Sequence, residues 1–261
     1  MSQTIAAIYR YPVKGLSPEP LGSVALTPGR CLPQDRRFAI ALPTTRFDPE
    51  RPEWLSKTHF VMLMRDEKLA ELTTRFDAEA DVLTIERDGR TVLRESLADA
   101  AGRRRAAAFF DEFLAGIAEG GLRIVEAPGH SFADARRKPN ATTDQYVSLI
   151  NLASIAALEH SLGAAVAPLR FRANVYFEGA PAWSELDWLE REIAVGGARL
   201  RIASAITRCA ATQVNPATAE RDLDIVRALQ RGFGHNLMGV YGEVVADGEI
   251  AIGDPLIPAP E

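Results

Sequence analysis

The chain has 261 residues, of which 47% are hydrophobic and 25% are charged, and its formal net charge is −5. This composition is typical of a globular protein with a full hydrophobic core, and the length is enough for one large domain or two smaller ones. The acidic balance argues against a general nucleic-acid-binding protein, which would need a basic surface.

The sequence contains two cysteines, Cys31 and Cys209, which can form at most one disulfide and fit no zinc or ferredoxin-type spacing. Such sparse cysteine predicts a reducing compartment. The first residues lack a basic segment followed by an apolar run, and no stretch reaches the ~18 apolar residues of a membrane helix. We therefore expect a cytoplasmic protein with no nucleic-acid or membrane partner and no iron–sulfur cluster of its own.

The beginning of the chain predicts short strands joined by turns. Strands are expected at residues 4–10, 23–26 and 38–42. A loop with two prolines and a glycine follows the first strand and carries Lys14, which is either an ordinary surface lysine or a mobile positive charge for a phosphate. Arg36 and Arg37 open the third strand, so only one of the two side chains should face a given pocket.

The middle of the chain is expected to mix regular and irregular segments. Residues 43–57 are irregular, residues 59–64 fit a strand or a helix start, and residues 67–74 fit a short helix or a strand. The Asp88-Gly89 turn predicts a hairpin. The remaining expectations are strands at 82–86, 91–94 and 121–126, a helix at 106–117 and a long polar loop at 128–143. Loops of that length tend to carry function or to move.

The last part of the chain again predicts strands, with two helices between them. The strands are expected at 147–151, 171–177, 193–195, 199–202 and 250–252, and the helices at 155–159, with residues 152–154 leading into it, and at 222–229. Asn151 or Ser154 caps the first helix, whose free N–H groups can also bind an anion. Arg172 and Asn174 alternate along one strand and should share a face. The expected fold class is α/β, rich in β-structure and barrel-like.

Residues 206–216 place an arginine and two threonines around Cys209 and end in an Asn-Pro turn signal. A lone cysteine usually acts as a small buried hydrophobe. A neighbouring guanidinium such as that of Arg208 favours the thiolate, which is the form that binds metals. The residues alone leave both interpretations open.

Six short motifs occur in a particular order: Tyr11-Pro12-Val13-Lys14-Gly15, Phe171-Arg172-Ala173-Asn174, Thr207-Arg208-Cys209, Asn215-Pro216, Phe233-Gly234-His235-Asn236 and the segment 248–254. The ordered set resembles the MOSC-domain family, relatives of the carboxy-terminal domain of molybdenum cofactor sulfurase that include the mitochondrial amidoxime-reducing component. The resemblance implies an N-terminal MOSC β-barrel-like region at 1–115 and a mixed β-barrel MOSC domain with flanking helices at 116–261.

The resemblance also implies a molybdenum–molybdopterin cofactor whose metal is bound by Cys209, the catalytic residue. The residues implied to contact the cofactor are Lys14, Arg36, Asn151, Ser154, Arg172, Asn174, Thr207, Arg208 and Asn236. Since these come from both ends of the chain, the first strands must fold back against the carboxy-terminal part. Pyridoxal phosphate, known in the sulfurase context, is not expected here.

The family implies an oxidoreductase that reduces small N-hydroxylated or N-oxide compounds by oxygen-atom transfer. The chain has no flavin or iron–sulfur motif, so the electrons should come from a separate flavin or iron–sulfur protein. Two alternatives remain: a carrier of molybdenum cofactor or sulfane sulfur, and a binder of another small anion in which Cys209 is structural.

Overall fold

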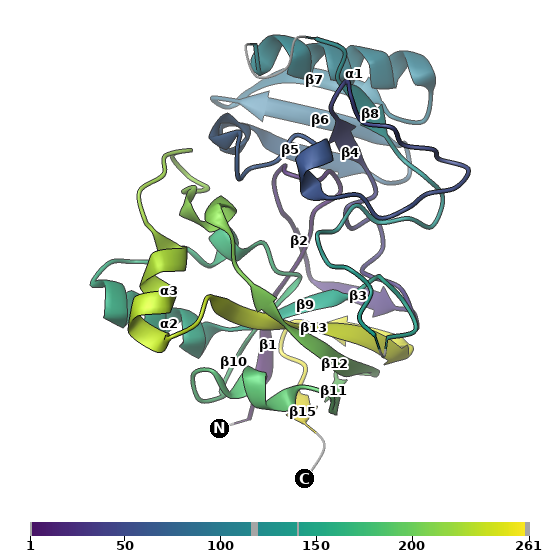
Figure 1. Cartoon of the computed structure of the whole chain (residues 1–261). Coiled ribbons are helices and arrows are strands. Elements are labelled where there is room, and N and C mark those ends of the chain that lie inside the picture. The colour runs from purple at the N-terminus through teal and green to yellow at the C-terminus, as the bar shows by residue number, and fades with distance from the viewer. Residues whose placement is uncertain (1, 116–119, 140, 259–261) are drawn as a thin grey trace.

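The computed structural model describes residues 2–115, 120–139 and 141–258, and its largest element is a curled eight-stranded sheet (Figure 1). The strands follow the order β15-β11-β12-β13-β9-β10-β1-β2, in which β9 and β10 are parallel and all other neighbours are antiparallel. Their bounds are β1 Thr4–Arg10, β2 Glu19–Leu21, β9 Val147–Asn151, β10 Val175–Glu178, β11 Glu192–Val195, β12 Ala198–Thr207, β13 Leu237–Ala246 and β15 Leu256–Pro258.

The sheet closes where the beginning of β1 contacts the residues just before the edge strand β15. Thr4 on β1 forms an isolated bridge with Pro255, and the Ile5 N–H donates to the Asp254 carbonyl at 2.9 Å. Strand β12 shows why the sheet encloses a core: Ala198, Leu200 and Ile202 alternate with more exposed residues and point inward. The sheet is therefore a mixed barrel around its own hydrophobic core.

Two helices cover the outer face of the barrel, and a small two-stranded sheet flanks it. Helix α2 (Leu152–Leu162) and helix α3 (Ile225–Phe233) pack beside each other in Figure 1, and Ile150 of β9 lies in the core beneath them. Strand β14 (Gly248–Ala251) pairs with β3 (Ser23–Leu26). Helix α2 begins after Asn151, whose side chain accepts from the Ala153 N–H, and ends at Gly163 in the left-handed region.

A second body, at the top of Figure 1, has its own core. It contains the pair β4 (Ala39–Ala41) and β8 (Arg123–Val125), the meander β5 (Thr73–Asp77), β6 (Val82–Arg87) and β7 (Arg90–Ser96), and helix α1 (Ala100–Phe113). Helix α1 lies against β7 because residue 102 is glycine: a Cβ atom on Gly102 would lie 1.8 Å from the Ser96 carbonyl oxygen.

The two bodies interleave along the sequence. Strands β1 and β2 belong to the barrel and β3 pairs with β14, although all three precede the second body, whereas β8 pairs with β4. A sequence division at residue 115 therefore does not separate the two hydrogen-bonded bodies. The return of the first strand to the carboxy-terminal part, by contrast, is seen directly in the β1–β10 pairing.

Most predicted strands occur, but several segments differ from expectation. Residues 59–64 form neither a strand nor an α-helix: His59 ends a 3-10 turn at Lys57–His59, Phe60 forms an isolated bridge with Ala41, and Leu63 begins another turn. The helix predicted at 106–117 begins at Ala100, where the Asp99 carboxylate caps the Gly102 N–H, and residues 116–119 lie outside the described residues. Helix α3 begins at Ile225, after the Asp224 cap, rather than at 222.

The strand predicted at 171–177 is shorter than expected. A 3-10 turn at Pro168–Phe171 comes first, Arg172 follows with a φ of 53°, and β10 begins at Val175. Arg36 also has a positive φ, of 51°, and lies in a turn rather than at a strand start. Strand alternation therefore does not position either arginine. In the described part of the chain, no helix has both the length and the apolar character needed to cross a membrane.

The long polar loop at 128–143 is attached to the barrel by the buried Glu243 of β13. One carboxylate oxygen accepts from the N–H and hydroxyl of Thr142, and the other accepts from Arg201 at 2.5 Å. Burial acts to raise the pKa of Glu243, but these donors outweigh it and hold the pKa below its ordinary value. The charged form of Glu243 therefore stabilises the fold.

We expect Glu243→Gln to lower the free energy of unfolding by about 1–3 kcal/mol at pH 7, because the amide turns a donor toward groups that already donate. Since the folded-state pKa is depressed, the difference from wild type should persist above about pH 4.3 and shrink as the pH falls further. Urea unfolding across this range measures it. The control is Glu192→Gln, an exposed carboxylate 4.0 Å from Arg199. Equal stability of both variants at pH 7 would contradict this role of Glu243.

Candidate functional site

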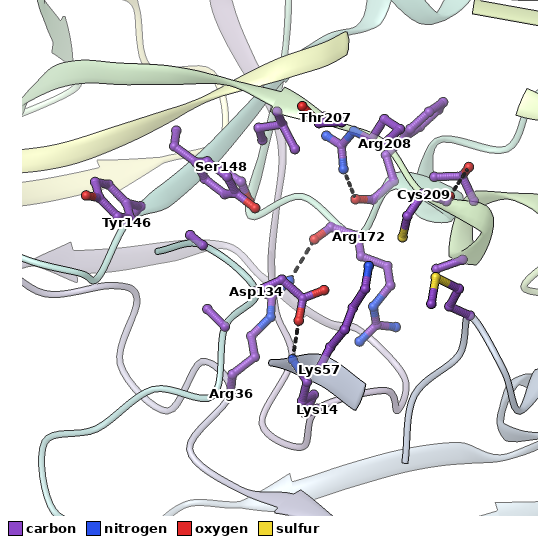
Figure 2. Close-up of a pocket in the computed structure, with 18 of the residues that line it drawn as sticks. Lys14, Arg36, Lys57, Asp134, Tyr146, Ser148, Arg172, Thr207, Arg208 and Cys209 are labelled. Carbon is purple, nitrogen blue, oxygen red and sulfur yellow. Dashed lines mark hydrogen bonds and ion pairs between the residues drawn. The ribbon is translucent and has the colours of Figure 1, made fainter. Parts of the chain in front are cut away.

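A cavity of about 500 Å³ lies where the barrel meets the second body. It is lined by segments from across the chain, including the loop of Lys14, the polar loop at 128–143 and the end of β12 (Figure 2). Eight lining residues are cationic and two are acidic: Lys14, Arg36, Lys57, Arg136, Lys138, Arg170, Arg172 and Arg208, against Asp35 and Asp134. In a chain of net charge −5, this concentration of positive charge favours an anionic ligand.

Arg36 and Arg172 are held around the buried ring of Tyr11. Their guanidinium carbons lie 4.3 and 4.4 Å from the ring centre, a cation–π geometry. Arg36 donates to Asp35 at 2.5 Å and to the Arg172 carbonyl at 2.8 Å, and Arg172 donates to the Leu16 carbonyl at 2.8 Å. The left-handed backbone at both arginines makes this arrangement possible, so the two charges are fixed by the fold.

Lys14 is 7% exposed, and its ammonium group donates to the Phe132 carbonyl at 2.8 Å and to the Asp134 carboxylate. Burial lowers the pKa of Lys14, and Asp134 opposes that shift. Burial acts to raise the pKa of Asp134, but Lys14 outweighs it and holds the pKa below its ordinary value. Because the side chain of Asp134 is 49% exposed and lies in a loop, it is a replaceable partner for Lys14.

Arg208 and Arg172 are bound by backbone carbonyls. Arg208 donates to Met238 at 2.5 and 2.9 Å and to Phe171 at 2.8 Å. Burial lowers the pKa of each of the two arginines. Both side chains thus keep a positive charge in the cavity wall without an ion pair to a carboxylate in the described part of the chain.

Cys209 follows β12 and precedes a 3-10 turn at Ala210–Gln213. Its carbonyl accepts from the N–H and hydroxyl of Thr212, at 3.1 and 2.9 Å, so the backbone of the turn is fixed. Arg170 supports the same turn by donating to the Gln213 carbonyl and to both oxygens of Asp222. The half-buried Cys209 thiol borders the cavity beside Arg172 (Figure 2) and makes no hydrogen bond within the described residues.

Cys31 has a different environment. Its thiol contacts the Asp35 carbonyl and the Gln145 amide oxygen, at 3.8 and 3.5 Å. Burial, together with the Asp35 charge, raises the pKa of Cys31 to about 12. It does not line the cavity and stays protonated at neutral pH, so it has the properties of a structural cysteine.

The structure brings seven of the residues singled out from the sequence to the cavity: Lys14, Arg36, Arg172, Asn174, Thr207, Arg208 and Cys209. Asn174 is also structural, since its amide accepts from Ser148 and donates to the Tyr9 carbonyl. Arg37 lies elsewhere, where it pairs with Asp81 and Glu126.

Three singled-out residues lie outside the cavity. Asn151 caps α2 and donates to the Pro181 carbonyl, and Ser154 donates to the buried Glu185 carboxylate. The Asn236 carbonyl accepts from the Arg208 N–H, so Asn236 stabilises the backbone of the cavity wall without lining the cavity itself. The start of α2 therefore faces Glu185 and not the cavity.

Sequence reasoning missed several lining residues: Lys57, Asp134, Tyr146, Ser148 and Tyr241. Asp134 lies in the long polar loop, whose length was a sign of function, but the partner of a single aspartate cannot be read from such a loop. Tyr146 and Tyr241 come from separate segments, and their rings lie 5.8 Å apart.

Known proteins resemble this chain over both of its parts. Residues 2–122 match the MOSC N-terminal beta barrel domain, and residues 129–257 match the MOSC domain. Molybdenum cofactor sulfurase of Anopheles gambiae is 28% identical over 151 residues, which are 51% of this chain and 19% of that protein. Mitochondrial amidoxime-reducing component 1 of Xenopus laevis is 30% identical over 122 residues, which are 42% of this chain and 35% of that protein.

Both alignments span a minor part of the relative's own length. Among solved structures, the YUAD protein from Bacillus subtilis aligns with a TM-score of 0.47 at 12% identity, over 100% of this chain and 98% of that chain.

We expect Asp134→Asn to raise the affinity of the cofactor-free protein for inorganic pyrophosphate by about fivefold, because it removes the charge that competes for Lys14. Isothermal titration calorimetry measures the change. Asp144→Asn, an exposed carboxylate near the end of the same loop and outside the cavity lining, is the matched control. If Asp134→Asn binds no more tightly than this control, Asp134 does not compete with the ligand.

Proposed function

This chain belongs to the MOSC-domain family, and from that premise we propose that it binds a molybdenum–molybdopterin cofactor at Cys209 and reduces small N-hydroxylated or N-oxide compounds. The observation that carries the proposal is a free thiol in a cavity with eight cationic lining residues. Electrons would come from a separate flavin or iron–sulfur protein.

The donor chemistry of the cavity fits this cofactor. Molybdopterin brings its own dithiolene sulfurs and a phosphate, so the protein must supply a soft ligand and positive charge. Cys209 offers a thiol with no hydrogen-bond partner among the described residues, and thiolate is the soft ligand that such a metal prefers. Lys14, Arg36 and Arg172 offer cationic donors for a phosphate.

Each protein group that lines or supports the cavity would have a role that follows from its position. Cys209 would hold the metal, and the turn fixed by Thr212 and Arg170 would keep its sulfur oriented toward the cavity. Arg208 would stabilise the thiolate, since it is the adjacent residue and carries a positive charge unpaired with a carboxylate in the described chain. The ring of Tyr11 would keep Arg36 and Arg172 from shifting when an anion arrives.

When bound, the cofactor supplies two-electron oxygen-atom transfer. The net reaction on an amidoxime takes up two electrons and two protons, breaks the N–O bond, and releases an amidine and water. Tyr241 borders the cavity with a hydroxyl group that can hold a proton near the substrate, whereas the Tyr146 hydroxyl donates to the Thr143 carbonyl at 3.0 Å. Burial raises the pKa of Tyr241, so its hydroxyl remains a protonated donor at neutral pH.

We expect Cys209→Ala to abolish molybdenum retention in protein purified from a host that makes the cofactor, because the protein ligand to the metal is lost. Cys31→Ala should retain molybdenum, since Cys31 lies outside the cavity lining and its thiol stays protonated. Elemental analysis with pterin fluorescence measures both variants. Equal molybdenum content in the two variants would show that Cys209 is not the ligand.

The loaded wild-type protein should reduce benzamidoxime to benzamidine with reduced methyl viologen as electron donor. Full molybdenum loading without reduction would count against the oxidoreductase. The carrier alternative rests on the same half-buried thiol: intact-mass spectrometry would then show a sulfur adduct on Cys209 in place of a stable metal complex. Protein with neither molybdenum nor a sulfur adduct would reject both functions.

A further inference from the structure

The cations of the cavity fall into two classes. Lys14, Arg36, Arg170, Arg172 and Arg208 each donate to carboxylates or backbone carbonyls of the protein. No hydrogen bond or ion pair holds the side chains of Lys57, Arg136 and Lys138 within the part of the chain that the structure describes. We refer to these last three as the mouth cations. The side chains of the first class are held in place by the protein. The N–H groups of the mouth cations remain available to a ligand.

Arg136 illustrates how a mouth cation is positioned without using up its hydrogen-bonding capacity. Its guanidinium carbon lies 4.4 Å from the ring centre of Trp54. Stacking of this kind uses the face of the guanidinium and leaves its N–H edge available for a carboxylate or phosphate. Arg136 is exposed, as expected of a residue that meets a ligand at the entrance.

Lys57 reaches from the opposite body, at the 3-10 turn Lys57–His59, and is half-buried. Figure 2 shows its side chain pointing into the space bordered by Arg172 and Cys209. The Lys57 charge also helps to lower the pKa of Asp134, so the two groups are electrostatically close. Lys138, on the polar loop, lines the same cavity. All three mouth cations thus line the same cavity as the Cys209 thiol, and none of them is buried.

We propose that Lys57, Arg136 and Lys138 form an anion subsite that binds a carboxylate or phosphate carried by the N-oxygenated substrate. This inference rests on the proposed function, and it names the class of substrate: a small molecule with its reducible N–O group at one end and a negative charge at the other. The fixed inner cations suit a resident cofactor, whereas unpaired cations at an entrance suit a ligand that must arrive and leave.

The test uses the molybdenum-loaded full chain and three substrates with one aryl amidoxime core: benzamidoxime, 4-carboxybenzamidoxime and a phosphate monoester of 4-hydroxybenzamidoxime. Wild type should prefer the charged substrates, and the preference should weaken with salt. Lys57→Gln should lower the ratio of kcat/KM for charged over neutral substrate by about fivefold, through KM. The charged group that gives the higher kcat/KM, carboxylate or phosphate, identifies the group that the natural substrate carries.

Lys68→Gln, an exposed lysine on a neighbouring turn that does not line the cavity, is the matched control and should keep the wild-type ratio. Molybdenum content is measured on each variant. An equal kcat/KM for charged and neutral substrates in wild type, or an unchanged ratio in Lys57→Gln, would overturn the subsite while the oxidoreductase stands. Loss of molybdenum in Lys57→Gln would make Lys57 a cofactor contact and also overturn it.

A binding measurement separates the subsite from the proposed reaction. Calorimetry with 4-amidinobenzoate, the product of the carboxylate substrate, should show weaker binding to Lys57→Gln than to wild type and Lys68→Gln. If no substrate is reduced by fully loaded protein but this difference is present, the oxidoreductase fails and the anion subsite stands. If the difference is absent, the subsite fails whatever the activity.

Discussion

The placement of positive charge inside the protein is the constraint on which the rest of the structure depends. Arg172 and Arg208 keep their guanidinium groups in the cavity wall with backbone carbonyls as partners. A buried charge costs several kcal/mol unless its donors are satisfied. The fold meets this cost by aiming carbonyls from Leu16, Phe171 and Met238 at the two side chains. A bound anion would then balance the positive charge of these two arginines, which the carbonyls solvate but do not neutralise.

This constraint explains why distant segments must meet. The Leu16 carbonyl belongs to the loop after β1, and the Met238 carbonyl belongs to β13, near the other end of the chain. Tyr11 lies in the same loop as Leu16, and its ring contacts Arg36 and Arg172, so it links this loop to the cavity wall. The barrel thus positions the cavity wall, and the second body contributes Lys57 and residues 62–64 on the opposite side.

The sequence predicted the β-rich fold and most of its strands, because alternation and turn residues report local geometry directly. The turn at 88–89 was readable for this reason. Local pattern failed where the backbone leaves regular structure: the positive φ angles at Arg36 and Arg172 come from tertiary contacts with Tyr11 and its loop. Lys57 could not be found, since an isolated lysine in an irregular segment carries no signal of what it faces.

Closure of the barrel has a consequence for biosynthesis. Strand β1 pairs with the nearby β2, but its other partners, β10 and the segment around Pro255, lie far later in the sequence. Until those segments are made, β2 is the one sheet neighbour available to this strand, and pairing over such a sequence separation is slow. The lining of the basic cavity includes Cys209 and Tyr241, so the cavity cannot form, or bind an anion, before these late segments have been synthesised.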